Sequence, residues 1–447
     1  MSQKECPPIP IQTFDISTAA LEAMFPIDVP GWVVLDRAPD AELLREAVRG
    51  VMAEFPALAS GLRLGWIKSR FEPIADLEPP LRVVDLEAAD PESIPAPLLK
   101  FFSTPLDMVR GPLAAFCLVR AKGCAFLGAN VHHGACDGRG LRYLLAALAT
   151  HYSALAAGHK PDRPVFRTDR IPNIIYGPMP FRRRAALIWR GLKMFAACFA
   201  APSPDRVEAT AGPGALTPVF FAGDERARIV AKARALGVTV NDLFLAALIR
   251  SYHRWNGKIV AFNVLIPQDL RPYGVGVPGV HLEEGEWRTV GNVLGVMFLF
   301  LRDDLPLADP DRLRQHVSAL VRAEKTAESA LAFASLAILP INLFPAKPFM
   351  ALYRRMDPGK VIGGLLHQST CLSNVGAAPA GQLTFGEARP LHFAFALPFI
   401  QNGGATFTAA GVGGAEGEGG SISFVITHPA TMDAKKFAAI FREEVFA

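Results

Sequence analysis

Val131-His132-His133-Gly134-Ala135-Cys136-Asp137-Gly138 is the stretch that places the most chemistry in the fewest residues of this chain. It follows an apolar run of strand length, CAFLGANV at 124–131, and precedes Leu141–Tyr152, where leucines recur at helical spacing. The sequence therefore predicts that two imidazoles and a carboxylate lie together at a strand-to-helix junction.

Composition indicates a globular, apolar protein of two lobes. The 447 residues exceed what one hydrophobic core usually organises, and 51% of them are hydrophobic against 20% charged. Because 46 basic and 42 acidic residues leave a net charge of only +4, we expect no nucleic-acid partner, whose binding needs a concentrated basic surface.

The six cysteines form no CxxC pair, and the N-terminus lacks a basic-then-apolar signal segment. We therefore expect a cytoplasmic protein with free thiols. The apolar window Ser329–Ala346 is interrupted by Pro340 and Pro345, so it predicts a buried helix followed by a loop rather than a membrane span.

Local patterns predict α/β character in the first lobe. Trp32–Leu35 has the pattern of a strand, and Asp40 is placed to cap a helix whose apolar face runs from Leu44 to Phe55. Ala114–Val119 and Cys124–Val131 predict a hairpin whose second strand delivers the histidines.

The second lobe repeats this character after a crossover. We predict lobes at 1–180 and 215–447, joined by a linker at 181–214. Strands are expected near Val219 and at Ile259–Ile266, Val293–Leu301, Thr370–Val375, Ala405–Ala410 and Ser421–Thr427, and helices at Glu225–Leu236, Asn241–Trp255 and Asp433–Val445.

The opening stretch resembles the HHxxxDG signature of the acyltransferase superfamily that contains chloramphenicol acetyltransferase, condensation domains and wax ester synthase/diacylglycerol acyltransferases. Its surroundings resemble the condensation family too: PLDMVRGPLAAFCLVR at 105–120 is similar to "PFDLxxGPLxRxxLxR", and Phe55–Leu58 to the start of "HPALR".

The resemblance continues through the second half in the family's order. Val238–Asp242 resembles "TxND", Asp269–Pro272 resembles "DLRP", Gly291-Asn292 resembles a "GN" strand start, and Ser373–Gly376 resembles "SNVPGP". It implies two chloramphenicol acetyltransferase-like lobes, each a mixed, largely antiparallel sheet with helices, and an active-site tunnel between them.

The chain departs from these patterns at two places. Ala59 replaces the arginine of "HPALR", which leaves Arg63 or Arg271 as candidate partners for Asp137, and Gly376-Ala377-Ala378 replaces the proline-glycine of "SNVPGP".

The resemblance makes His133 the general base that takes the acceptor's proton as it attacks a thioester. A neutral imidazole, with a reference pKa near 6.5, suits that task at neutral pH. By the same resemblance Asp137 braces the loop through an arginine, while His132 packs and Gly138 permits the turn. A His133–Asp137 catalytic dyad is the alternative for the carboxylate.

Ser373 and Asn374 are candidate donors to the oxyanion, and a polar strand end capped by Gly376 is an equal alternative for them. Two histidines and an aspartate could also hold a metal, but adjacent strand residues project in different directions, so no metal is expected. Gly419–Ser423 superficially resembles a phosphopantetheine attachment site, although a hairpin is the better interpretation.

The stretch 182–200 interleaves Arg182, Arg183, Arg184, Arg190 and Lys193 with apolar residues. It fits an amphipathic helix on an anionic membrane, a possible peripheral contact, but a linker helix docked on the protein with a solvated basic face is favoured.

These features together predict an acyltransferase that uses coenzyme A thioester as co-substrate, with no bound cofactor and a small-molecule or lipid acceptor carrying a hydroxyl or amine. A separate phosphopantetheinyl carrier protein docking in trans is the alternative donor. The alternative from another class is a catalytically silent condensation-like module that recruits a carrier or partner enzyme.

Overall fold

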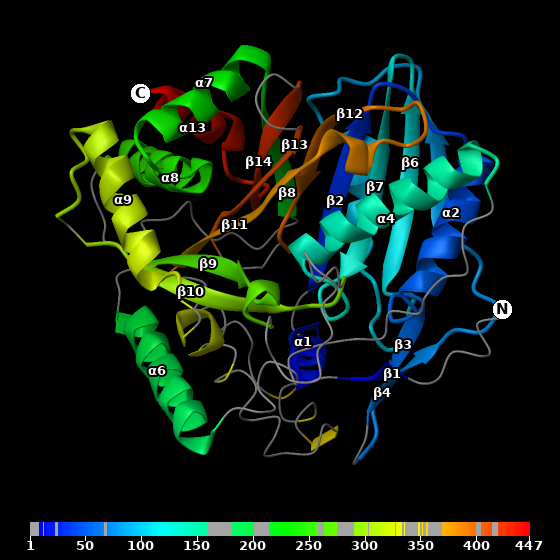
Figure 1. Ribbon diagram of the computed structural model, residues 1–447, viewed down its shortest axis with the longest axis horizontal. Coiled ribbons are helices and arrows are strands. Elements are labelled where there is room, and N and C mark those ends of the chain that lie inside the picture. The colour runs from blue at the N-terminus through cyan, green and yellow to red at the C-terminus, as the bar shows by residue number, and fades with distance from the viewer. Residues whose placement is uncertain are drawn as a thin grey trace.

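The computed structural model describes residues 9–11, 13–22, 26–66, 69–159, 180–200, 214–257, 263–274, 290–302, 304–326, 328–332, 335, 347–348, 351, 355, 369–398, 404–413 and 419–447. Two large sheets lie side by side within these ranges, and helices cover their outer faces (Figure 1). The predicted α/β class with mixed, largely antiparallel sheets is confirmed.

The first large sheet has the strand order β12-β2-β7-β6-β5, and only its β5–β6 pair is parallel. Its strands are β2 (Asp28–Leu35), β5 (Leu81–Asp85), β6 (Ala114–Ala121), β7 (Cys124–His132) and β12 (Pro390–Phe395). The predicted hairpin is confirmed: β6 and β7 are antiparallel, with pairs running from Ala121–Cys124 at the turn to Ala114–Val131. All nine residues of β7 are buried, so the strand fixes where the histidines emerge.

Helices α2 (Ala41–Glu54) and α4 (Gly138–Ala156) pack against each other over this sheet, and α3 (Ala96–Phe102) contacts β6 and β7. Asp40 caps α2 as expected, because its carboxylate accepts from the backbone N–H groups of Glu42 and Leu43 at 2.9 Å. Asp137 caps α4 through the N–H of Gly140. The start of α4 is therefore fixed by a residue of the HHxxxDG loop itself.

The second large sheet has the order β10-β9-β11-β13-β14-β8, with β11 parallel to both of its neighbours. Its strands are β8 (Gly214–Ala222), β9 (Asn263–Asp269), β10 (Leu294–Phe300), β11 (Ser369–Ala378), β13 (Thr406–Gly413) and β14 (Gly420–Pro429). Helices α7 (Gly223–Ala235), α8 (Val240–Asn256), α9 (Pro310–Glu324) and α13 (Ala434–Phe446) accompany it. Each strand and helix predicted in this half has a counterpart whose ends differ by a few residues; residues 259–262 of the predicted strand Ile259–Ile266 lie outside the described part of the chain.

Helices α3 and α9 and strand β5 were not predicted from the sequence, and neither were several shorter elements. A third sheet of β1 (Ile9–Pro10), β4 (Arg70–Pro73) and β3 (Ser60–Arg63) lies near α1 (Thr13–Glu22), and the 3₁₀ turns η2 (Arg271–Gly274) and η3 (Ala380–Leu383) were also missed. Strands of two to four residues carry too few positions for an alternating pattern to stand out.

β12 crosses between the predicted lobes. It belongs to the 215–447 segment, yet it pairs with β2 and adds an edge strand to the first sheet. The hydroxyls of Ser421 and Ser423 on β14 donate to β12 carbonyls at 2.9 and 2.7 Å, so β12 also joins the two sheets. The division of the chain at 181–214 stays a prediction, but the sheets do not follow it strictly.

Two predicted segments lie largely outside the described residues. Of the crossover, the structure describes α6 (Phe181–Ala200) and omits 201–213. Of Ser329–Ala346, it describes a buried helical piece up to Ala332 and the single residue Ser335. Within the described ranges, no helix is both long and apolar enough to cross a membrane.

The glycine-rich stretch before Ser423 lies at the start of β14, which pairs antiparallel with β13 up to Gly413 and Gly420. The hairpin interpretation of Gly419–Ser423 is confirmed by this pairing.

Candidate active site

The HHxxxDG loop leaves β7 as a tight turn. The N–H of His133 donates to the carbonyl of Ile27 at 3.1 Å, and the N–H groups of Ala135 and Cys136 both donate to the carbonyl of His132. Because the chain reverses within these four residues, the two imidazoles separate: His132 is fully buried, whereas His133 is half-buried and borders a cavity.

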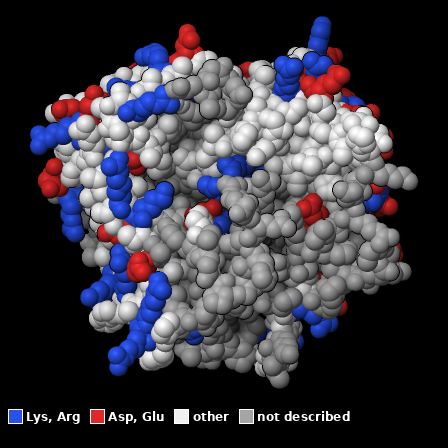
Figure 2. Space-filling model, in the orientation of Figure 1, with Lys and Arg blue, Asp and Glu red and all other residues white. Residues whose placement is uncertain are grey.

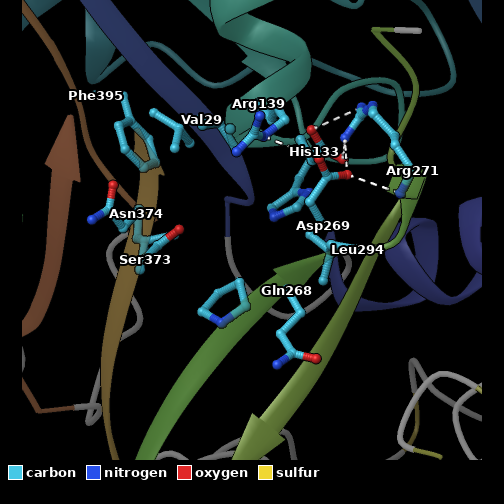
Figure 3. Close-up of a pocket in the computed structure, with 15 residues that line it drawn as sticks. Val29, His133, Arg139, Gln268, Asp269, Arg271, Leu294, Ser373, Asn374 and Phe395 are labelled. Atoms are coloured by element: carbon cyan, nitrogen blue, oxygen red, sulfur yellow. Dashed lines mark hydrogen bonds and ion pairs between the residues drawn. The ribbon is translucent and has the colours of Figure 1, made fainter. Parts of the chain in front are cut away.

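This cavity lies between the two large sheets and is open to solvent. Elements of both sheets and the start of α4 contribute side chains to it, as Figure 3 shows. The lining residues are Val29, His133, Asp137, Gly138, Arg139, Pro267, Gln268, Asp269, Arg271, Leu294, Ser373, Asn374, Val375, Phe395 and Leu397. Polar and apolar side chains both line it: Arg139, Asp269 and Arg271 lie near His133, whereas Gln268, Ser373 and Asn374 lie on other sides of the cavity (Figure 3).

Asn292 holds His133 in place. Its side-chain amide donates to the backbone carbonyl of His133 at 2.8 Å and lies 3.2 Å from Nδ1 of the same imidazole. Burial lowers the pKa of His133 below its usual 6.5, although the backbone carbonyl of His133 and the charge of Asp137 act in the opposite direction. The imidazole is therefore neutral at physiological pH, the form that can accept a proton.

His132 faces the interior. Its Nδ1 accepts from the N–H of Gly134 at 3.1 Å, which leaves the proton on Nε2, 3.6 Å from the Glu22 carboxylate. Nearby, Asp28 accepts from the N–H of Leu106 at 2.9 Å, and burial raises the pKa of its carboxyl to about 6. These contacts indicate that His132 packs inside the protein and supports the loop, and that it does not face the cavity.

Asp137 is fully engaged by groups other than His133. Its two oxygens accept from the guanidinium of Arg271, both at 3.1 Å, from the N–H of Gly140 at 2.6 Å, and from the N–H of Val293 at 2.7 Å. No hydrogen bond between Asp137 and His133 is present in the described contacts. This geometry fits bracing of the loop rather than a dyad.

Of the two candidate partners, Arg271 pairs with Asp137. Arg63 lies on β3 with its side chain 62% exposed, and its Nε donates to Glu72 at 2.7 Å. The substitution of Ala59 therefore does not leave Asp137 without an arginine.

Arg271 also ties the second sheet to the loop. It donates to the Asp269 carboxylate at 2.9 Å and to the carbonyl of Gly291 at 2.8 Å, while Arg139 holds the other oxygen of Asp269 at 3.1 Å. Burial lowers the pKa of Arg271, but the charges of Asp137 and Asp269 outweigh it and the net shift is upward. The guanidinium stays charged, as a buried brace requires.

Ser373 and Asn374, adjacent on β11, have different surroundings. The Asn374 amide is occupied, because it accepts from the N–H of Gly376 at 2.7 Å and donates to Asn241 at 3.2 Å. The Ser373 hydroxyl has no hydrogen-bond partner in the described part of the chain, and Figure 3 shows it directed toward the cavity. Asn374 therefore fits the interpretation as a polar strand end capped by Gly376. Ser373 keeps a hydroxyl that can donate a hydrogen bond into the cavity.

Gly138 lets the first turn of α4 approach the cavity wall. A Cβ at this position would lie 2.9 Å from a ring carbon of Phe395 and 3.1 Å from a methyl carbon of Val375. Gly138 is the first residue of α4 and is not among the glycines with positive φ, so the prediction that it permits the turn is wrong. Close packing of α4 against β12 and β11 is what favours a glycine here.

Two features of the site escaped the sequence analysis. Gly291-Asn292 and Asp269–Pro272 were recognised as family-like segments, but the contact of Asn292 with His133 and the Arg139–Asp269 pair were not predicted. The residues in these two contacts are far apart in the sequence, so no local sequence pattern indicates that they meet. Among the described residues, no group of three or more His, Cys, Asp or Glu side chains could hold one metal ion.

Comparison with known proteins finds similarity in structure only. No protein-family model matches the chain, and no curated protein matches it in sequence. The first condensation domain of the calcium-dependent antibiotic synthetase, solved with a substrate analogue, has a TM-score of 0.64 and 17% identity, over 98% of this chain and 95% of that one.

Two other solved structures cover the chain as fully. Polyketide synthase associated protein 5 from Mycobacterium tuberculosis has a TM-score of 0.62 and 15% identity, over 98% of this chain and 96% of its own. The epimerization domain from the third module of tyrocidine synthetase B has a TM-score of 0.57 and 15% identity, with the same coverage. Together with the two large sheets, these likenesses show that the chain has the two-lobed, chloramphenicol acetyltransferase-like fold seen in condensation domains.

Proposed function

We propose that this protein is an acyltransferase that moves an acyl group from a thioester to a hydroxyl or amine, with His133 as general base. The observation that carries the proposal is the neutral, half-buried imidazole of His133 at a cavity between the two sheets, held by Asn292 from the opposite half of the chain. A positioned base of this kind typically contributes about 10²–10⁴-fold to rate.

The chemistry follows from the side chains around that ring. The unprotonated nitrogen of His133 takes the acceptor's proton as the acceptor oxygen or nitrogen attacks the thioester carbonyl. The oxyanion that forms accepts a hydrogen bond from the Ser373 hydroxyl. When the carbon–sulfur bond breaks, the imidazolium returns its proton to the leaving thiolate, so the base is restored.

The donor is proposed to be a coenzyme A thioester, with a phosphopantetheinyl carrier protein in trans as the alternative. The acceptor is proposed to be apolar, because Val29, Leu294, Phe395 and Leu397 line the cavity. Entry of donor and acceptor from opposite faces is part of this proposal.

The epimerization domain among the structural neighbours makes clear that one fold serves more than one reaction, so the site has to carry the argument. The silent-module alternative depended on the missing arginine at Ala59. Since Arg271 pairs with Asp137, that reason for it no longer applies.

The test is release of free coenzyme A from acetyl-, octanoyl- and palmitoyl-coenzyme A, followed with a thiol reagent in the presence of a set of alcohols and amines. Mass spectrometry identifies any acylated acceptor. Acyl N-acetylcysteamine thioesters, which mimic the end of a carrier arm, are assayed in parallel to separate the two donors.

His133→Ala is expected to abolish turnover, and Ser373→Ala to lower kcat by about 10²-fold with little change in KM, since its hydrogen bond forms at the oxyanion. His159→Ala, at an exposed residue beyond α4, is the matched control. Turnover by folded His133→Ala at the wild-type rate, or absence of transfer from every thioester by wild type, would overturn the proposal.

A further inference from the structure

Helix α6 (Phe181–Ala200) lies at the lower left of the molecule in Figure 1, beside β10 and outside both large sheets. It contains no acidic residue, and its basic residues are Arg182, Arg183, Arg184, Arg190 and Lys193. Figure 2 shows blue side chains gathered on this part of the surface.

One side of α6 is docked on the protein. Leu187 is 3% exposed, and Met194 packs against Val296 and Phe298 of β10. Two of the arginines are also held there: Arg190 donates to Ser329 at 2.6 Å, and Arg183 lies 3.2 Å from a carboxylate oxygen of Glu328. These contacts fix the rotation of the helix, and hence which side chains face outward.

The outward side is apolar. Phe181 is 83% exposed, Trp189 is 60% exposed and Leu192 is 43% exposed, although such large side chains are usually buried. At about 100° per residue these three fall within one sector of about 80° of the helix. They form a continuous apolar stripe along α6.

Cations border this stripe. Arg182 and Lys193 follow it at about 100–120° around the helix. Arg182 has no ion-pair partner within the described part of the chain, and the ammonium of Lys193 lies 5.4 Å from the centre of the Trp189 ring. The expectation that α6 is docked on the protein therefore holds for its inner side. The outer side is an apolar stripe bordered by cations, rather than the solvated basic face that was expected.

We propose that the outward face of α6 rests on an anionic lipid surface. Phe181, Trp189 and Leu192 would enter the boundary between headgroups and acyl chains, while Arg182 and Lys193 contact lipid phosphates. A second copy of the chain fits less well, because a symmetric contact through this face would bring like charges together. The proposal does not depend on the reaction at His133.

The test is flotation of the full-length protein with vesicles of phosphatidylcholine containing phosphatidylglycerol, and with vesicles of phosphatidylcholine alone. Wild type is expected to float with the anionic vesicles and to remain unbound with the neutral ones. Phe181→Ala/Trp189→Ala is expected to lose binding, and Arg182→Glu/Lys193→Glu to lose at least about fivefold per charge.

Matched controls carry the same changes elsewhere. Trp66→Ala removes an aromatic ring that is 67% exposed on the β3–β4 turn, and Lys100→Glu/Lys122→Glu reverses two exposed charges of the first lobe. Both are expected to float like wild type. Analytical ultracentrifugation of all variants reports their oligomeric state.

Three results would overturn the proposal: equal flotation with neutral vesicles, wild-type flotation of both α6 variants, or losses in the controls as large as those in the α6 variants. A wild-type dimer that becomes monomeric in Phe181→Ala/Trp189→Ala would also overturn it, because the stripe would then be an interface between two copies.

Discussion

Arg271 grips Asp137 with two guanidinium nitrogens, each 3.1 Å from a carboxylate oxygen, across a separation of 134 residues. Both side chains are nearly fully buried, with exposed fractions of 3% and 4%. The pair joins the start of α4 to the second sheet, so it holds the loop that carries His133 between the two halves.

Loss of this arginine is therefore expected to damage both stability and activity. Arg271→Ala leaves Asp137 buried without its cation, and breaking a buried pair in this way typically costs about 3–5 kcal/mol. Urea denaturation followed by circular dichroism measures the loss. Arg271→Lys is expected to fall between wild type and Arg271→Ala, because lysine keeps the charge but not the two-pronged geometry.

Arg63→Ala is the matched control for that experiment. Its partner Glu72 is exposed, and exposed pairs contribute little, so the urea midpoint should stay close to that of wild type. Equal destabilisation by Arg63→Ala and Arg271→Ala would contradict the role given to Arg271.

With His133 as the proposed general base, the acid limb of the activity profile is expected to report the pKa of its imidazole. Since burial lowers the pKa of this imidazole, the neutral form persists below pH 6.5, and kcat/KM should fall only as the pH drops through the lowered pKa. Asn292→Asp puts an anion beside the ring, stabilises the imidazolium and is expected to move the limb to higher pH.

Asn292→Ala removes the hydrogen bond to the His133 carbonyl and is expected to reduce kcat by about tenfold or more through loss of positioning. Thermal denaturation checks that each variant is folded. An acid limb in the same place for wild type and Asn292→Asp would show that the limb belongs to another group.

Gly138→Ala is expected to disturb the site through packing alone. The added methyl group would press on Phe395 and Val375, and overpacking of this kind typically costs about 1–3 kcal/mol. Phe395→Leu in the same chain should restore part of the stability and turnover. Gly381→Ala, where a Cβ would meet nothing within 4 Å, should leave both unchanged; a comparable loss there would discredit the packing explanation.

Asp28, a buried residue near His132, is expected to make the free energy of unfolding depend on pH. Its folded pKa of about 6 exceeds the reference 3.8, so the folded state binds the extra proton, and stability should decrease as the pH rises from about 4 to 6. The decrease from this group is at most about 3 kcal/mol. Asp28→Asn should flatten that part of the curve, measured by denaturation at several pH values; an unchanged slope would argue against it.

Much of the local structure was predictable because its signals are local. The short apolar runs of β6 and β7, the 3.6-residue period of α2 and the cap at Asp40 each depend on neighbours a few residues away. The same holds for the turn that presents His133. β12 was missed because what makes it a strand is the edge of β2, far away in the sequence.

The sequence by itself determined the chemical groups: His133 as the candidate base, Asp137 and Gly138 as its support, and two arginines as possible partners. Only the tertiary structure decided that Arg271 pairs with Asp137, that Asn292 holds His133, and that Ser373 rather than Asn374 keeps a free hydrogen-bond donor. The physical reason is that ion pairs and hydrogen bonds depend on distances of about 3 Å in space, and spacing along the chain does not encode those distances.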